Sequence, residues 1–418
     1  MTKISSKNTT NLGQAWDRIR PLVVNESISK PRGVALLMVL IMVSLMAAFS
    51  TEFSYNTRVN LKMASNLERE VQAYYHARSS VELARMVIRG QALVDQMLGL
   101  VAQFAPNVAS QNIEMWNYAC KFAEIYNTGR VDLFGIELFD LSGQKGIGVE
   151  KGAFECSADA EDGRVNINFV ETPQAKKGLF KQLFGYLQGP RPEGIGLTED
   201  DKERAEMILN IIDWVDADQV RSDFDAQGNI VDGGGGSEDF AYAKFDYESK
   251  NAKFDSVDEV RLIDGLDDET FCKIRDKITV YSTEKLNVNT ADIELIKAVV
   301  CEAVSPELQM VLCGPAIGGA PISGIDVVGG AIEMCRNIKK MLYTAPFNSP
   351  KSFTDFFGRL PDEFGGAIPV NSQALQQVIG TKSRVIRVKG TGKVGATEKT
   401  VTAVIDTSTG KYVYWRED

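Results

Sequence analysis

The chain has 418 residues, too many for one ordinary hydrophobic core, so two or more domains are expected. Apolar residues make up 44% and charged residues 24% of the chain, which is typical of a globular protein. The net charge of −10 argues against a nucleic-acid partner and favours cations, because an acidic surface repels phosphate and attracts positive ions.

The charge is unevenly distributed along the chain. Residues 1–33 hold six basic and two acidic side chains, a net of +4, so the remainder carries −14. Basic residues just before an apolar run keep that side of the membrane cytoplasmic. The acidic bulk of the chain is therefore expected across the membrane.

An apolar run follows the basic leader directly. Lys30-Pro31-Arg32-Gly33 precedes Val34–Phe49, sixteen residues of which only Ser44 is polar. The order is wrong for an ordinary secretory signal, because the candidate cleavage point, Gly33-Val34, lies before the apolar run. Sixteen helical residues span about 24 Å, slightly less than the hydrocarbon core of a bilayer.

The pattern then becomes amphipathic without a break. Apolar residues recur at helical spacing from Phe53 to Val87, interleaved with charged residues. We expect one helix over Val34–Arg89, with its first part in lipid. A plain signal anchor followed by a coiled stalk fits these residues equally well.

The start of the chain resembles the N-terminus of type IV prepilins and pseudopilins. That resemblance implies cleavage after Arg32-Gly33 and methylation of the new terminus, Val34. Most members carry glutamate at the fifth mature position, where this chain has Met38. The K-type minor pseudopilins of type II secretion, which this chain resembles, likewise lack that acid. A carboxylate in lipid is costly unless it is paired, and a subunit with no neighbour above it has no terminal amine to pair with.

Residues 96–170 read as a mixed α/β segment. Residues 92–104 and 112–125 are predicted to be helical, Val131–Phe139 and Val149–Ala158 to be strands, and Cys156 to lie in the sheet. Glu161–Asn168 reads as a turn into a strand. In the K-type family a similar element precedes a large helical insertion.

Acidic residues crowd the segment Leu209–Tyr247. Carboxylates at short spacing suit a hard cation, calcium above all, although a solvated acidic loop accounts for the composition equally well. Asp-Trp-x-Asp-x-Asp followed by Glu-Asp-x-x-Tyr resembles the K-type signature, which implies a calcium site. The resemblance gives as first ligands Asp216, Asp218, Glu238 and Asp239. It gives as second-site or outer groups Asp213, Asp223 and Asp225.

Three later segments read as helix-hairpin-helix units: Ser256–Glu269, Leu286–Val300 and Ser352–Leu360. Gly265 would form the first turn and Thr290 would cap the second helix. DNA binding is excluded on charge, because acidic residues surround the first turn. We expect protein-packing modules, as in the K-type family.

The six cysteines point to disulfides if the bulk of the chain lies outside the cytoplasm. Cys301 and Cys313 are a candidate local bridge, and Cys272 could pair with Cys335. A zinc site is the weaker alternative, because there is no CxxC pair and the single histidine, His76, falls on the stalk. The Gly- and Pro-rich stretch Gly314–Gly330 has no counterpart in the family.

Three strands are predicted at the end of the chain: Ser383–Thr391, Glu398–Thr407 and Lys411–Trp415. The strands are expected to be separated by two turns, Gly390-Thr-Gly392 and Thr409-Gly410. The strands should complete the sheet begun at Val131, with the helical region inserted into the sheet domain.

The predicted fold class is therefore α+β, with a long N-terminal transmembrane and stalk helix, an antiparallel pilin-like sheet and a large all-α insertion. The expected parts are a leader (1–33), a membrane helix (34–52), its periplasmic continuation (53–95), the first part of the α/β domain (96–170), the helical insertion (171–380) and the C-terminal strands (381–418).

The chain contains no phosphate loop and no Ser-His-Asp set, so no enzymatic activity is expected. The resemblance implies a single-pass inner-membrane protein with a periplasmic bulk, at the tip of a type II secretion pseudopilus, that helps to initiate assembly and protein export. Implied partners are other minor pseudopilins, the inner-membrane platform, prepilin peptidase, and secreted substrates or the outer-membrane secretin. The rivals are a type IV pilus tip subunit or anchored adhesin, and a calcium-dependent anchored hydrolase.

Overall fold

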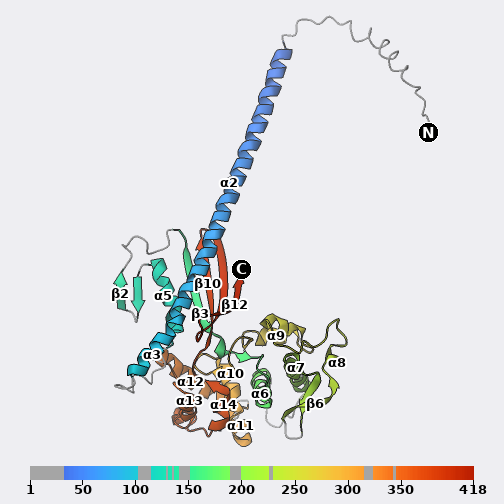
Figure 1. Cartoon of the computed structure of the whole chain (residues 1–418), viewed down its shortest axis with the longest axis vertical. Coiled ribbons are helices and arrows are strands. Elements are labelled where there is room, and N and C mark those ends of the chain that lie inside the picture. The colour runs from blue at the N-terminus through green and yellow to red at the C-terminus, as the bar shows by residue number, and fades with distance from the viewer. Residues whose placement is uncertain are drawn as a thin grey trace, which may run out of the picture. The chain divides into compact units, whose positions relative to one another are not determined.

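The computed structural model describes residues 33–101, 114–128, 130–133, 136–140, 151–188, 199–225, 229–314, 323–341 and 345–418. The chain divides into two units, Met1–Glu68 and Arg69–Asp418, which we describe separately. Helices and an antiparallel sheet together confirm the α+β class (Figure 1).

Helix α2 runs unbroken over Val34–Arg89, as the sequence predicts. In the first unit its apolar side chains from Val34 to Phe53 are exposed. Within the described residues, one helical stretch, Val34–Met97, is long and apolar enough to cross a membrane. Gly90 separates α2 from α3 (Gln91–Val101).

The second unit contains a four-stranded antiparallel sheet in the order β12-β11-β10-β3. Its strands are β3 (Ala153–Ala160), β10 (Val385–Val394), β11 (Thr397–Asp406) and β12 (Tyr412–Glu417). The Arg69–Arg89 part of α2 packs on one face of this sheet (Figure 1). Ala77, Val81 and Ala84 on the helix meet Val388 and Ala403 on the strands, and all five are fully buried.

Two glycines allow α2 to approach the sheet closely. A Cβ atom on Gly392 would lie 1.9 Å from the Ala73 carbonyl oxygen, and one on Gly390 would lie 2.1 Å from Ser80 Oγ. Both glycines lie inside β10, so the prediction that they form a turn between strands is wrong. They are needed because backbone meets backbone at this contact.

The predicted strand Val131–Phe139 is also wrong, because it is a hairpin. β1 (Arg130–Leu133) pairs antiparallel with β2 (Ile136–Asp140) in a separate two-stranded sheet. The C-terminal strands therefore complete a sheet begun at β3, where β10 pairs with Ala153–Ala160.

Helix α5 (Trp116–Thr128) packs on β3 and is joined to it by the disulfide Cys120–Cys156, which the sequence analysis did not propose. The side chain of Asn127 also pairs with the backbone of Phe154 on this strand, accepting from its N–H at 3.1 Å and donating to its carbonyl. The outer edge of β3 is thus covered by a helix.

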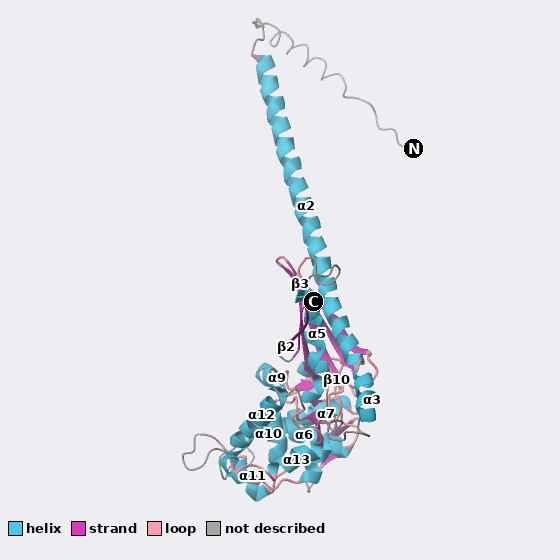
Figure 2. Ribbon diagram, turned by 90° about the vertical axis from the view of Figure 1, so that its left-hand side faces the viewer, coloured by secondary structure: helices cyan, strands magenta, loops and turns pink. Residues whose placement is uncertain are grey.

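A second hydrophobic core fills the region between β3 and β10 in the chain. Its longer helices gather at one end of the four-stranded sheet (Figures 1 and 2). The helices are α6 (Pro173–Gln188), α7 (Glu199–Val215), α8 (Asp239–Tyr242), α9 (Asp268–Ile274), α10 (Ile293–Cys301), α11 (Pro306–Leu312), α12 (Gly324–Met341), α13 (Pro350–Phe357) and α14 (Ser372–Val378). The 3-10 turns are η1 (Glu161–Gly163), η2 (Val257–Leu262) and η3 (Asp362–Phe364).

Short strand pairs support this core. β4 (Val165–Asn166) runs parallel to β7 (Ile278–Thr279), β8 (Leu286–Asn287) runs parallel to β9 (Ile379–Gly380), and β5 (Val220–Phe224) is antiparallel to β6 (Ile230–Ser237). Val165 and Ile167 already belong to the core of the helical region. The turn before them therefore marks the point where the chain leaves the sheet.

That turn, η1, ties the two cores together. The buried carboxylate of Asp162 accepts from the backbone N–H groups of Arg384 at 2.7 Å and Val385 at 2.8 Å, and from Thr283 Oγ1 at 2.9 Å. Glu161, also buried, forms ion pairs with Arg164 at 2.7 Å and with Arg387 of β10. Two adjacent acids thus bind residues of the sheet and of the helical region.

The helix-hairpin-helix interpretation holds only in part. The predicted segment Ser256–Glu269 opens with the 3-10 turn η2, and Gly265 (φ +85°) precedes α9. The predicted segment Leu286–Val300 opens with strand β8, and its helix is capped by Asp292, whose side chain accepts from Glu294 N at 2.9 Å. The prediction that Thr290 is the cap is therefore wrong.

The helical region contains the disulfide Cys301–Cys313, which links the end of α10 to the end of α11. The suggested pairing of Cys272 with Cys335 is wrong, since both are free thiols. Part of the Gly- and Pro-rich stretch forms the start of α12, while residues 315–322 lie outside the described residues.

Candidate metal centre

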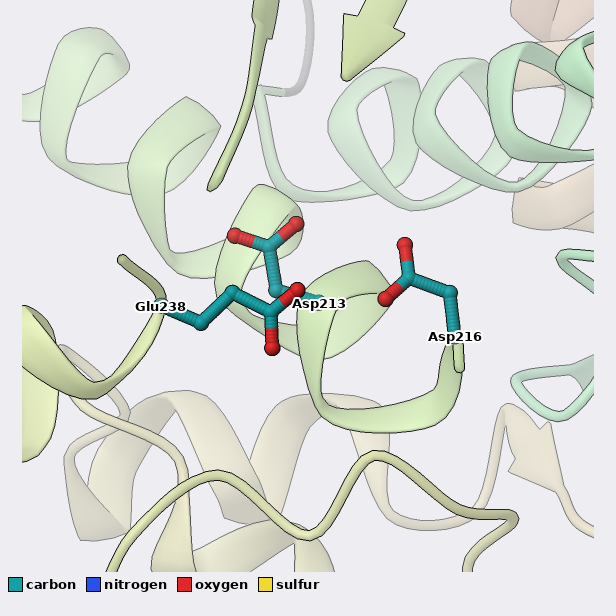
Figure 3. Close-up of side chains that lie close together, drawn as sticks. All are labelled: Asp213, Asp216 and Glu238. Carbon is teal, nitrogen blue, oxygen red and sulfur yellow. The ribbon is translucent and has the colours of Figure 1, made fainter. Parts of the chain in front are cut away.

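Three acidic side chains from different elements converge in the helical region. Asp213 lies in the last turn of α7, Asp216 follows that helix directly, and Glu238 lies between β6 and α8. Figure 3 shows the three carboxylates grouped in one place. One oxygen from each lies within 4.8 Å of the others. The β5–β6 hairpin brings Glu238 back to the end of α7.

Several oxygens of these carboxylates are buried without a hydrogen-bond partner. Asp213 and Glu238 are each 2% exposed. Oδ1 of Asp213 accepts from the backbone N–H of Ser222 at 3.1 Å. Oδ2 of Asp213, Oδ1 of Asp216 and both oxygens of Glu238 are buried without a hydrogen-bond partner. Buried polar atoms in native proteins are normally paired, so these oxygens indicate a ligand.

The electrostatics of the cluster agree with this reading. Burial, with repulsion from Asp216 and Asp213, raises the pKa of Glu238 to about 8. Burial also raises the pKa of Asp213 to about 6, although hydrogen bonding from the Ser222 N–H opposes the shift. A carboxylate held among like charges is stabilised by a cation that neutralises them.

The donor set fits calcium. Ca²⁺ takes carboxylate and carbonyl oxygens at about 2.3–2.6 Å, so two oxygens on one ion are at most about 5 Å apart. The three carboxylates each have an oxygen within 4.8 Å of the others, which is compatible with that limit. Asp213, Asp216 and Glu238 are therefore the residues that would hold the ion.

A second acidic group adjoins the first and shares Asp216. Oxygens of Asp216, Asp218 and Asp232 also lie within 4.8 Å of one another. Lys176 of α6 binds two of these acids, with Nζ 2.8 Å from Asp216 and 2.5 Å from Asp232. Burial alone would lower the pKa of Lys176, but the two carboxylates raise it above its usual value.

Three of the expected ligands have local hydrogen-bonding partners. Asp239 accepts from the backbone N–H of Ser249 at 3.2 Å. Asp225 accepts from Asn229 N at 2.7 Å within the β5–β6 turn. Asp223 accepts from the N–H of the next residue at 2.7 Å. None of these three belongs to either acidic group found among the described residues.

Two buried aromatic residues, Trp214 and Tyr242, pack against each other close in sequence to these acids. Trp214 is buried, its ring centre lies 5.4 Å from that of Tyr242, and its indole N–H donates to Glu259 at 3.2 Å. Tyr242 is 1% exposed. The tryptophan and tyrosine of the signature thus pack against each other and fix the ends of α7 and α8 that carry Asp213, Asp216 and Glu238.

Asp232 belongs to the second acidic group and Lys176 binds it, but no pattern in the sequence predicts either residue there. Asp232 stands alone before a run of four glycines, and no spacing rule links it to Asp216. Lys176 lies in the first turn of a helix forty residues earlier and looks like any surface lysine. Only the packing of α6 against α7 brings it to the acids.

Three of the proposed processing residues, Gly33, Val34 and Met38, lie at or within the start of α2. Arg32 falls outside the described residues. The carbonyl of Gly33 accepts from Leu37 N at 3.1 Å, so the helix begins directly at Val34. Met38 is 62% exposed in the first unit.

No protein-family model and no curated protein matches the sequence. Among solved structures, the chain is similar to the GspK-GspI-GspJ complex of the type 2 secretion system from enterotoxigenic Escherichia coli. The match has 13% identity and a TM-score of 0.48, and covers 85% of this chain and 99% of that one.

Proposed function

We propose that this chain is a K-type minor pseudopilin of a type II secretion system, with a structural and not a catalytic role. The observation that carries the proposal is the arrangement of α2. It begins at Val34, directly after the Gly33 of a basic-glycine pair, and stays apolar through Phe49. It then continues without a break onto the face of an antiparallel sheet that holds a large helical insertion.

The position of Met38 supports a place at the tip of the filament. After cleavage at Gly33 it is the fifth residue, where an acid would need the terminal amine of a neighbouring subunit. An apolar residue removes that need. The bulky helical region would also hinder the addition of another subunit above this one.

An exposed stripe on α2 supports helix–helix contact with other minor pseudopilins. Val71, Tyr75 and Met86 are exposed large apolar residues, and Tyr75 is 57% exposed. These residues lie on the face of α2 opposite the buried residues Ala73 and Ala77, where Arg78 and Glu82 stand between them. A second amphipathic helix is the partner that fits such a mixed face.

Calcium binding at Asp213, Asp216 and Glu238 is the second part of the proposal. The ion would neutralise the buried acids and hold the end of α7 to the start of α8. Its role there is structural, because it fixes the β5–β6 hairpin on the helical core.

A photo-reactive residue in place of Tyr75 tests the proposed partners in living cells. We expect an adduct with other small subunits that have one N-terminal helix and belong to the secretion system. Phe240, which is 78% exposed on α8, serves as the matched control position. Adducts with a type IV pilin would favour the rival pilus function, and a lack of any adduct specific to Tyr75 would contradict the proposal.

A further inference from the structure

Lys176 is a buried cation inside an acidic centre. It lies in the first turn of α6, which Thr172 caps by accepting from Ala175 N, and it is 7% exposed. Its ammonium reaches Asp216 at 2.8 Å and Asp232 at 2.5 Å. A lysine is seldom buried this far unless acids surround it.

The ammonium lies among ligand-like oxygens. Asp216, Asp218 and Asp232 have the oxygen spacing of an ion site, and they line a cleft of about 1150 Å³ together with Lys176. An ion from solvent could therefore reach these acids. The ammonium of Lys176 neutralises the negative charge of two of these three acids, Asp216 and Asp232.

Asp216 connects this position to the neighbouring group. Its Oδ2 binds Lys176 and its Oδ1 has no hydrogen-bond partner, and the same residue belongs to the cluster with Asp213 and Glu238. One carboxylate is thus shared between a built-in monovalent cation and the proposed calcium. The positive charge of Lys176 must weaken calcium binding nearby, because like charges repel.

We propose that Lys176 is the intrinsic counter-cation of the acidic centre. Its ammonium occupies the place of a second divalent ion, limits the centre to one calcium, and holds Asp216 to Asp232 when calcium is absent. This inference rests on the proposed calcium binding. It makes Lys176 a residue that sets the number of ions and their affinity.

The test compares K176M with K177M in the detergent-solubilised full chain, after treatment with chelator. Lys177 is the matched control, because it is adjacent, carries the same charge, and binds Asn229 Oδ1 at 2.8 Å outside the acidic groups. Calcium titration should give one ion for the unmodified chain and for K177M, and two for K176M. The first ion should bind at least about tenfold more tightly to K176M.

Thermal melting provides a readout that does not depend on stoichiometry. Without calcium, K176M should melt below K177M, because the largely buried Asp216 loses its cationic partner. With saturating calcium the difference should close. K176Q, which keeps hydrogen-bond donors but not the charge, should behave like K176M if charge is the cause.

The outcomes separate the two claims. Unchanged affinity and stoichiometry in K176M, or two ions bound by the unmodified chain, would overturn the role of Lys176. If the unmodified chain binds no calcium but K176M does, the calcium proposal fails, and with it the claim that Lys176 limits the centre to one ion, whereas the claim that its ammonium takes the place of an ion stands. If neither binds calcium, both fail.

Discussion

Glu238 has a buried carboxylate in which neither oxygen has a hydrogen-bond partner, so its substitution separates a metal ligand from a structural acid. In E238Q the charge is lost and the shape is kept. We expect calcium affinity to fall at least about tenfold, since affinity follows the number of charged ligands. We also expect the calcium-free protein to melt about 2–4 °C higher, because an uncompensated buried acid is removed.

The matched control for this change is E248Q, because Glu248 is an exposed acid ten residues away. It should alter neither affinity nor melting temperature. If E238Q binds calcium as tightly as the unmodified chain, Glu238 is not a ligand.

The same acids predict how stability depends on pH. The folded pKa of Glu238, about 8, lies above its ordinary value of 4.5, and that of Asp213, about 6, lies above 3.8. A raised acid pKa means that the folded chain binds more protons than the unfolded chain. These two groups therefore make the calcium-free protein less stable as the pH rises from about 4 to 8.

Calcium should reverse this trend, because it binds the deprotonated acids. Melting curves of the full chain in chelator and in calcium, recorded across that pH range, check the prediction. The calcium-induced rise in melting temperature should grow with pH. A rise that is the same at pH 5 and pH 8 would contradict the ligand assignment.

At this scale the sequence predicts an acidic calcium site, and the structure brings together a set of acids that differs in part from the predicted ligands. Asp216 and Glu238 were expected first, whereas Asp213 was placed among the outer groups and Asp239 among the ligands. Asp213 lies one helical turn before Asp216, which puts both at the same end of α7. Asp239 is next to Glu238, but its side chain turns toward Ser249. Side-chain direction of this kind is fixed by packing, which a spacing pattern does not contain.

At the scale of elements, the contact between α2 and β10 depends on two glycines. In G392A the new methyl group would overlap the carbonyl of Ala73, and backbone cannot move aside as a flexible side chain can. We expect a loss of about 1–3 kcal/mol in the free energy of unfolding. Chemical denaturation of the detergent-solubilised full chain measures it.

G236A is the matched control for this prediction. Gly236 lies in β6, and a Cβ atom there would meet nothing within 4 Å. It should change stability by less than about 0.5 kcal/mol. Equal stabilities of G392A and G236A would mean that α2 does not pack tightly on the sheet.

The elements also show where periodicity fails. The apolar positions change from odd numbers in β1 (Val131, Leu133) to even numbers in β2 (Ile136, Leu138), so the prediction of a single strand overlooked a change of register. Gly390 and Gly392 are turn residues by composition, yet here they serve a helix that is more than 300 residues away in sequence. In contrast, α2 and the three C-terminal strands could be predicted, because each has a long and regular pattern.

At the scale of the whole molecule, the insertion of a helical region between β3 and β10 was predictable from the order of the elements. The means of attachment was not. Asp162 and Glu161 join residues more than 100 positions apart, and the disulfide Cys120–Cys156 depends on the packing of α5 against β3. Such long-range pairs leave no local pattern in a single sequence.

We propose that Arg32-Gly33 is a prepilin peptidase site and that Val34 begins the mature subunit. Mass spectrometry of the N-terminal peptide from the membrane-extracted protein is the direct test. We expect a chain that starts at Val34 with a methylated amine. A chain that still begins at Met1, or one that begins within or beyond the apolar run, would contradict it.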